Sequence, residues 1–196
     1  MFFKYKVILL FLIGLLLVAG CGNDQSTPES EDAISIKVVN NSEDIIVSFA
    51  LFYGPGLDEW GEDLLNDEII EPGDNFVFMV PPGSYDLFLL TYENYIIDII
   101  REIDENRTIE IGKEGKLPVL ITNSTELEVA RLFISPVESD SWGSDWLGKE
   151  VIPPGVSRFF FLEPGVYDIL AQDLEEEPLI NVFDMNIESQ AHLVIE

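Results

Sequence analysis

Hydrophobic and polar residues alternate from residue 34 onward, in short runs that turn-forming residues interrupt. Residues 34–38 (ISIKV) alternate strictly, and residues 45–53 form a β-branched and aromatic run that alternates in part. Period-2 runs of this kind are typical of half-buried β-strands. Five further runs lie at residues 68–70, 76–80, 85–92, 95–103 and 108–111. Seven short strands with a turn signal every 8–12 residues or so predict an all-β, antiparallel sandwich.

The same pattern occurs twice along the chain. Residues 38–87 laid over residues 120–169, at a constant offset of 82 without gaps, are identical at 17 of 50 positions. Agreement at this level indicates an internal duplication. The matched pairs include Asn41 with Asn123, Trp60 with Trp142, Asp63 with Asp145, and Tyr85 with Tyr167. Beyond residue 90 the register drifts by one and then two residues, which pairs Ile97 with Ile180 and Ile109 with Leu193.

The duplication and the flanking sequence predict four segments. Residues 1–20 form a signal peptide, and residues 21–33 form a segment that begins at Cys21 and continues as a flexible linker. Residues 34–116 and 117–196 form two tandem antiparallel β-sandwich domains. A domain of about 80 residues buries only a little over 60% of its unfolded surface, so each copy alone is marginal. We therefore expect the copies to pack against each other across the short connector at residues 112–116.

Composition excludes several classes of protein. The chain has 10 basic and 37 acidic residues, a formal charge of −27, and 47% of it is hydrophobic. This charge opposes binding to nucleic acid, because the phosphates would be repelled. The hydrophobic fraction is too high for a disordered acidic tail. A single cysteine cannot form a disulfide within its own chain, so stability must come from burial.

The first residues have the features of an export signal. Lys4 and Lys6 precede an uninterrupted apolar run at residues 7–20, and Cys21 follows that run directly. A charged start, a short apolar stretch and a small-residue exit describe a secretory signal peptide. A membrane span needs about 20 apolar residues, so an uncleaved anchor is the less favoured alternative. An ordinary cleavage site beside a free thiol is a second alternative.

The four residues Val18-Ala19-Gly20-Cys21 resemble the lipobox of bacterial lipoproteins. The resemblance implies that the thiol of Cys21 carries a diacylglyceryl group and that the chain is cleaved before it. Two or three acyl chains give stable attachment, since each buried CH₂ contributes roughly 0.8 kcal/mol. Loss of Lys4 and Lys6 leaves 8 basic and 37 acidic residues, a formal −29. Anionic headgroups repel such a surface, so we expect the body to stand off the membrane, outside the cytoplasm.

Two motifs resemble known repeat domains. Residues 82–87 (PGSYDL) and 164–169 (PGVYDI) resemble the strand–turn–strand hairpin of prealbumin-like and carboxypeptidase-regulatory-like domains. In this turn we expect Gly83 to adopt a positive φ and Tyr85 to close one end of the core. The Trp-Gly-x-Asp-x-Leu loop is similar to one in uncharacterised secreted bacterial repeat domains. The resemblance implies an Ig-like or prealbumin-like sandwich that serves in binding, spacing or assembly and carries no particular activity.

The two tryptophan loops are the candidate binding sites. They place Asp58 and Asp63 in the first unit, and Asp140 and Asp145 in the second, around a glycine. Ca²⁺ takes six to eight oxygen ligands, and acidic loops supply them. The favoured alternative is that Asp63 and Asp145 accept local backbone N–H groups. The three tryptophans of the chain, which offer faces for a sugar ring or a partner protein, are Trp60, Trp142 and Trp146.

Signals of catalysis are weak. His192 is the only histidine, and we expect a structural role for it in the last strand. Without a second histidine or a free cysteine, the usual zinc sites and Cys–His pairs cannot form. Two hypotheses stay open. One is a non-catalytic envelope lipoprotein that binds or spaces a protein or glycan, and the other is a calcium- or carbohydrate-binding module that uses the tryptophan loops.

Overall fold

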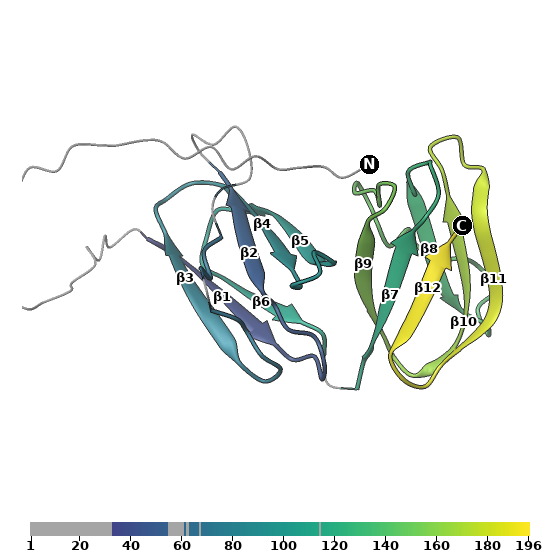
Figure 1. Ribbon diagram of the computed structural model, residues 1–196, viewed down its shortest axis with the longest axis horizontal. Helices are drawn as coiled ribbons and strands as arrows, with labels where there is room; N and C mark the ends of the chain where they lie inside the picture. Colours follow the sequence, from purple (N-terminus) through teal and green to yellow (C-terminus); the bar gives the residue numbers. More distant parts are fainter. Residues whose placement is uncertain (1–32, 55–60, 62, 67, 114) are drawn as a thin grey trace, which may run out of the picture.

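The computed structural model describes residues 33–54, 61, 63–66, 68–113 and 115–196. Within these residues the protein is all-β and contains twelve strands (Figure 1). None of the described residues belongs to a helix long and apolar enough to cross a membrane. The strands of the first half are β1 (Ile34–Asn40), β2 (Phe49–Tyr53), β3 (Asn75–Val80), β4 (Tyr85–Leu90), β5 (Ile96–Ile103) and β6 (Arg107–Ile111). Those of the second half are β7 (Leu117–Asn123), β8 (Arg131–Pro136), β9 (Ser157–Leu162), β10 (Gly165–Gln172), β11 (Pro178–Ile187) and β12 (Ala191–Ile195).

The strands of the first half pair in two groups. β1 pairs antiparallel with β3 and parallel with β6, and β4 lies antiparallel between β2 and β5. In the second half β7 pairs antiparallel with β9 and parallel with β12, and β10 lies antiparallel between β8 and β11. The order of pairing is therefore the same in both halves, as expected for a duplicated unit.

The structure gives six strands per half where the sequence pattern predicted seven. The missing strand is the one expected at residues 68–70. That segment contributes only an isolated bridge between Val47 and Ile70, and the second half has the same bridge between Val129 and Ile152. Three residues are enough to close one backbone pair and too few to extend a ladder.

Strand register corrects the ungapped alignment in the first strand. Asn40 and Asn123 occupy the same place, because both end the central strand, are fully buried and donate to two backbone carbonyls. The alignment at an offset of 82 paired Asn123 with Asn41 instead. Asn40 and Asn123 are 83 positions apart, whereas the bridge residues Val47 and Val129 are 82 apart. The second half is therefore one residue shorter between the asparagine and the bridge.

Register also moves the point at which the two units drift apart. Asp98 and Ile180 lie in the same place, opposite Leu89 in one half and Ala171 in the other. The predicted pairing of Ile97 with Ile180 was therefore wrong by one residue. Equivalent residues of the two halves stay 82 positions apart to the end of β5. The separation rises to 84 positions only in the turn that precedes the last strand of each half, β6 or β12.

Alternation within the strands builds two separate hydrophobic cores. Along β1, Ile34, Ile36 and Val38 are buried and the residues between them are partly exposed, so one face of the strand points inward. Buried residues of the first half form one cluster and those of the second half form another. Leu120 and Phe159 are the exceptions, because these residues of the second half join the core of the first.

The Pro-Gly-x-Tyr turns hold their tyrosines as predicted, and their glycines differ from prediction. The hydroxyl of Tyr85 donates to the carbonyl of Pro81 at 3.0 Å, and that of Tyr167 donates to Glu163 at 2.9 Å. Each bond spans the turn, and each ring packs against its own core. Gly83 and Gly165, which lie two residues before these tyrosines, do not have the positive φ that we expected. Positive φ occurs instead at Gly73 (87°) and Gly155 (77°), in the preceding turn of each half.

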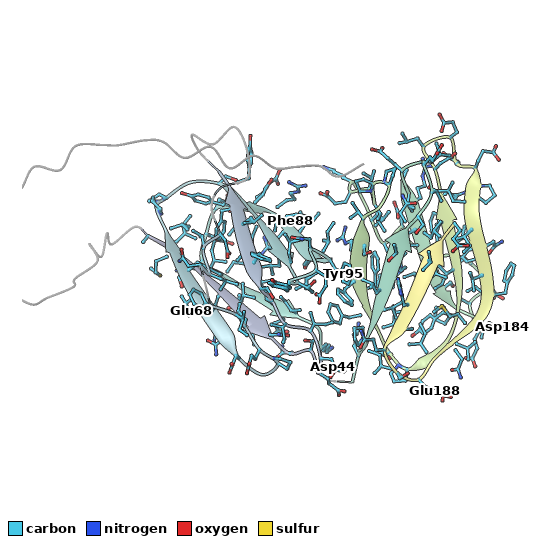
Figure 2. The ribbon with its side chains drawn as sticks, viewed as in Figure 1. Asp44, Glu68, Phe88, Tyr95, Asp184 and Glu188 are labelled. Carbon is cyan, nitrogen blue, oxygen red and sulfur yellow. The ribbon has the colours of Figure 1, made fainter. Side chains whose placement is uncertain are left out.

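The two halves meet along β5 and β9. A single parallel bridge, Ile96 to Arg158, continues the β2–β4–β5 sheet into β9, β7 and β12. The ring of Tyr95 lies edge-on to Phe159 with centroids 6.2 Å apart, and Figure 2 shows Tyr95 between the halves. Arg101 of β5 bonds Glu150 of the second half through Nε at 2.9 Å and Nη2 at 3.0 Å. These contacts agree with the expectation that the copies pack together.

Candidate functional site

The residues predicted as sites divide into those inside and those outside the described part of the chain. Cys21, Asp58 and Trp60 lie outside the described residues, so the structure gives no account of them. Asp63, Asp140, Asp145, Trp142 and Trp146 are described. The geometry of the tryptophan loop is therefore seen mainly in the second half.

Asp63 and Asp145 hold the start of their loops in the same way. The backbone N–H groups of Ala50 and Leu65 donate to Oδ1 of Asp63 at 2.9 and 3.1 Å. The equivalent N–H groups, of Leu132 and Leu147, donate to Oδ1 of Asp145 at 2.9 and 3.0 Å. One carboxylate oxygen in each loop thus ties a strand to the turn that crosses it. This arrangement matches the favoured alternative, in which these residues accept backbone N–H groups.

Trp142 lies beside a shallow pocket of about 240 Å³. The pocket is lined by three serines and two carboxylates, namely Ser135, Ser139, Ser141, Asp140 and Asp168. The hydroxyls of Ser135 and Ser139 both donate to the carbonyl of Ser141 at 2.8 Å, which folds the loop over the end of β8. The ring of Trp142 lies 6.4 Å from that of Phe183 at a tilt of 41°. Phe183 is 61% exposed, so the two rings form an aromatic pair at the surface.

Trp146 has a different role from Trp142. Its indole Nε1–H donates to the carbonyl of Ile134 at 3.2 Å, and its ring lies edge-on to Phe160 at 6.2 Å. The side chain therefore covers one edge of the second core while remaining 41% exposed. It also lines a second pocket of about 400 Å³, on the Gly143 side of the loop.

The two acids of the second loop line neighbouring pockets, which share Ser135, Ser139 and Trp142. Asp140 lines the first pocket and Asp145 the second, and Oδ1 of Asp145 already accepts two backbone N–H groups. The second carboxylate near Asp140 is Asp168, whose Oδ1 already accepts the N–H of Asp184 at 3.0 Å. Among the described residues no three acidic, histidine or cysteine side chains gather as a metal-binding group. The pocket beside Trp142 thus offers two carboxylates, serine hydroxyls and an aromatic face.

Sequence reasoning missed Phe183 and Asp168 as neighbours of Trp142. Asp168 was noticed only as part of the repeated Tyr-Asp pair, and its partner Asp86 accepts the N–H of Glu102 in the same way. Phe183 stands where the first unit has Arg101, so nothing in the alignment singled it out. Both come from the strand pair β10 and β11, which the chain places beside the loop only after folding.

Arg158 is the most unusual charged residue outside the loops. Its side chain is nearly buried, and its Nε and Nη1 have no hydrogen-bond partner among the described residues. Asp98 of the first half lies 3.7 Å from Nη2, and the guanidinium lies 5.5 Å from the ring centre of Phe160. Burial lowers the pKa of Arg158, and the charges of Asp98 and Glu150 oppose that shift. The sequence could have pointed to Arg158, because the equivalent residue of the first half is the apolar Phe76.

His192 belongs to a polar chain that crosses three strands. Its Nε2 lies 2.8 Å from Oγ1 of Thr122, which lies 2.7 Å from Oγ of Ser157. The three residues come from β12, β7 and β9, which are neighbours in the sheet. These bonds tie the strands together side by side, in keeping with the structural role expected for this histidine.

Neither a protein-family model nor a curated protein matches this chain. Solved structures are similar at low levels, among them the following three. The TIE protein of Bacillus anthracis has 13% identity and a TM-score of 0.28, over 84% of this chain and 34% of that one. A family 26 carbohydrate-binding module of Eubacterium rectale Amy13K, solved with maltoheptaose, has 8% identity and a TM-score of 0.29, over 82% and 91% of the two chains.

The third structure is a leucine-rich repeat protein of Bacteroides thetaiotaomicron. It has 6% identity and a TM-score of 0.33, over 84% of this chain and 26% of that one. The chain thus spans about a third of the TIE protein and about a quarter of the leucine-rich repeat protein. Scores this low carry no argument about fold or function.

Proposed function

We propose that this protein is a lipid-anchored, non-catalytic protein of the cell envelope, built from two tandem β-sandwich repeats of Ig-like or prealbumin-like type. The observation that carries the proposal is Val18-Ala19-Gly20-Cys21 at the end of an apolar run that follows Lys4 and Lys6. Cys21 is then the attachment point, and the chain is exported and held on the outer side of the membrane.

The described fold supports the proposal in two ways. Both halves have the same order of strand pairing, and each has its own hydrophobic core, as tandem sandwich repeats require. Asp63 and Asp145, one of the pairs that the two loops share, accept backbone N–H groups and hold the fold. This pair therefore has a structural role, which favours a binding or spacing function over catalysis by these carboxylates.

Charge supports a body that stands away from the lipid surface. The formal charge after removal of residues 1–20 is −29, so anionic headgroups repel the folded part. Residues 22–33 (GNDQSTPESEDA) have the composition of a flexible linker. The partners that fit this arrangement are the membrane, through the lipid, and an envelope protein or glycan that the outer surface meets.

Intact mass of protein extracted from membranes tests the anchor. The expected mass is that of the chain beginning at Cys21 plus the diacylglyceryl group and any further acyl chain. The matched control is Cys21→Ser, which keeps the side-chain size and removes the thiol, and this variant is expected to lack the added acyl mass. A wild-type mass equal to the unmodified chain, with or without residues 1–20, would contradict the proposal.

A second candidate function is carbohydrate binding at the loop of the second half. The observation that favours it is the pair of the partly exposed Trp142 and the exposed Phe183 beside a pocket with Asp140, Asp168 and serine hydroxyls. Stacking on an aromatic face together with polar contacts at its rim is a chemistry suited to a sugar ring. We expect Trp142→Ala to abolish binding on a glycan array and Trp146→Ala to leave it intact. Binding that survives Trp142→Ala would exclude this loop as the site.

Calcium is the other ligand proposed for the tryptophan loops, through Asp58, Asp63, Asp140 and Asp145. Any ligand that binds only the folded state raises the melting temperature. We therefore expect millimolar Ca²⁺ to raise the melting temperature of the wild type, and Asp140→Asn to reduce that rise. An unchanged melting temperature in the wild type would remove calcium from the proposal.

A further inference from the structure

The contact between the two halves is made by two unlike surfaces. We define the β5 surface of the first half by Tyr95, Ile97, Asp98 and Arg101. We define the β9 surface of the second half by Leu120, Glu150, Arg158, Phe159 and Phe161. Because the surfaces differ, the halves pack in one direction only, with β5 of one unit beside β9 of the next.

Each half also has a strand equivalent to the one that its neighbour contributes to the internal contact. In the first half, β3 is equivalent to β9, and in the second half, β11 is equivalent to β5. Within the described residues, neither β3 nor β11 takes part in the contact between the halves. Figure 1 shows that β3 and β11 lie at opposite ends of the molecule. The equivalent residues on the β3 surface are Lys37, Glu68, Phe76, Val77 and Met79. Those on the β11 surface are Glu177, Leu179, Ile180 and Phe183.

Equivalent residues are covered inside the molecule and open at its ends. Phe159 is 6% exposed between the halves, and its counterpart Val77 is 47% exposed on the outer face of β3. Phe161 is partly buried against the first core, and its counterpart Met79 is 61% exposed. Ile97 is fully buried between the halves, whereas Leu179 is partly exposed. The ends thus carry apolar side chains at the positions that the internal contact uses.

The chemistry of the two open surfaces changes in a matched way. Leu120 of the internal contact pairs with Phe159 across the strands, and Tyr95 packs on that same ring. Their counterparts are Lys37, which pairs with Val77, and Glu177. The two apolar residues beside Phe159 inside the molecule are therefore replaced by a base, Lys37, on one open surface and by an acid, Glu177, on the other.

The reverse replacement occurs at the neighbouring position. The internal contact pairs Arg158 with Asp98, whereas the open surfaces have Phe76 and Ile180 there. One pair does not keep this complementarity. The internal contact pairs Arg101 with Glu150, whereas the equivalent residues of the open surfaces are Phe183 and Glu68. Two independent positions thus changed on both surfaces together, and each change keeps the surfaces complementary to each other.

We propose that the β11 surface of one chain binds the β3 surface of a second copy, in the arrangement that the two halves already adopt within the chain. A head-to-tail contact of this kind uses unlike surfaces and leaves one of each free, so it extends into a series. Both β3 and β11 are edge strands, and edge strands of this type pair readily with another chain. The high negative charge opposes the contact at low salt.

Sedimentation of the full-length, membrane-extracted protein in detergent tests the proposal, in about 1 M salt, where the Debye length is about 3 Å. We expect the wild type to form species that grow with protein concentration. Met79→Glu and Phe183→Glu each block one surface and are expected to remain monomeric. A 1:1 mixture of the two variants retains one good surface of each kind, so it is expected to form dimers and stop there.

Val137→Glu is the matched control, because Val137 is an exposed apolar residue (38%) that follows β8, on the far edge of the sheet from β11. We expect this variant to assemble like the wild type. A monomeric wild type would overturn the proposal, as would a monomeric mixture or assembly of either single variant. Loss of assembly in the Val137 variant would do the same, because the contact would then not depend on the two surfaces.

Carbodiimide crosslinking locates the contact. The reagent joins a lysine amine to a carboxylate with loss of water, and we expect a link between Lys37 and Glu177. These residues belong to opposite ends of one chain, so the link must join two copies. In a mixture of isotopically heavy and light chains, half of the linked peptides are expected to be mixed. A Lys37 link confined to unmixed peptides, or to residues outside the β11 surface, would contradict the arrangement.

Discussion

In the first half of the molecule, Phe76 lies beside Phe78 with ring centroids 4.8 Å apart. In the second half the same two places hold Arg158 and Phe160, and the guanidinium lies over the ring. The exchange removes an apolar side chain from the mouth of one core and supplies a charge that faces Asp98 of the other half. The comparison teaches that a position which serves its own core in one repeat can face the neighbouring unit in the other.

The residues that agree form the internal frame of each unit. Asn40 and Asn123 are fully buried, and each binds two carbonyls and the turn that follows it. Asp63 and Asp145 tie a strand to the crossing loop. The agreement of these polar residues follows from the high cost of leaving buried backbone groups without partners.

The largest effect is expected from removing the buried asparagine of either half. Asn40→Ala and Asn123→Ala each remove two hydrogen bonds to backbone carbonyls, which keep one other donor each, and leave the N–H of Ser42 or Thr125 without its acceptor. A lost hydrogen bond costs about 0.5–1.5 kcal/mol and an unpaired buried group about 1–3 kcal/mol, so we expect a loss of roughly 4 kcal/mol in the free energy of unfolding. Urea unfolding measures the loss. Asn75→Ala, at an exposed asparagine, is the control, and a loss at only one of the two buried positions would break the equivalence of the halves.

The next effect concerns the contact between the halves. Phe159→Ala empties the space between Tyr95 and Leu120, and we expect a loss of about 3 kcal/mol in the free energy of unfolding. The two halves are then expected to unfold in separate transitions, because their main shared side chain is gone. Calorimetry detects the separation. Val77→Ala, at the equivalent exposed position, is expected to have little effect, and equal losses at both positions would contradict the assignment of Phe159 to the interface.

A smaller effect distinguishes a structural aspartate from a cation ligand. Asp145→Ala removes the acceptor for two N–H groups, and we expect a loss of about 1–2 kcal/mol in the free energy of unfolding. Asp145→Asn keeps an acceptor oxygen at that place and is expected to lose less. The same pair of changes at Asp63 is expected to give the same order in thermal and urea unfolding. An equal loss for alanine and asparagine would show that the charge, rather than the acceptor, matters.

The smallest effect is expected from Arg158. Arg158→Met removes a nearly buried cation whose Nε and Nη1 have no partner among the described residues, and it leaves Asp98 partly exposed to water. We expect the free energy of unfolding to stay constant or to rise by about 1 kcal/mol. Chemical denaturation measures the change. A loss of more than about 1 kcal/mol would instead show that the pair with Asp98 is a net stabilising interaction.

Alternation of apolar residues was enough to predict an all-β chain, because a half-buried strand must alternate. Repetition was enough to predict that Asp63 and Asp145 act alike, and the structure gives both the same two kinds of backbone bond. The aromatic pair of Trp142 and Phe183 was beyond reach of the sequence. Its members lie on different hairpins, and the pairing depends on how β11 is placed beside the loop.

Register was also decided by contacts distant in the sequence. The alignment paired Asn41 with Asn123, because adjacent asparagines look alike in a linear comparison. Folding selects Asn40, because only that residue points into the core at the end of β1 and reaches the carbonyls of Ile45 and Ile70. The positive φ values at Gly73 and Gly155 have a similar origin, since each N–H bonds the carbonyl of the buried asparagine.

The sequence by itself determined the strand content, the duplication and the acidic charge of this protein, because each follows from residue type and spacing alone. It also supplies the motif at Cys21 on which the proposed anchor rests. Only the tertiary structure decided which faces of the two units meet and which stay open. The physical reason is that Phe159 and Val77 are both apolar residues at the same place in their strands, and only the neighbouring half, which covers Phe159, makes one of them buried.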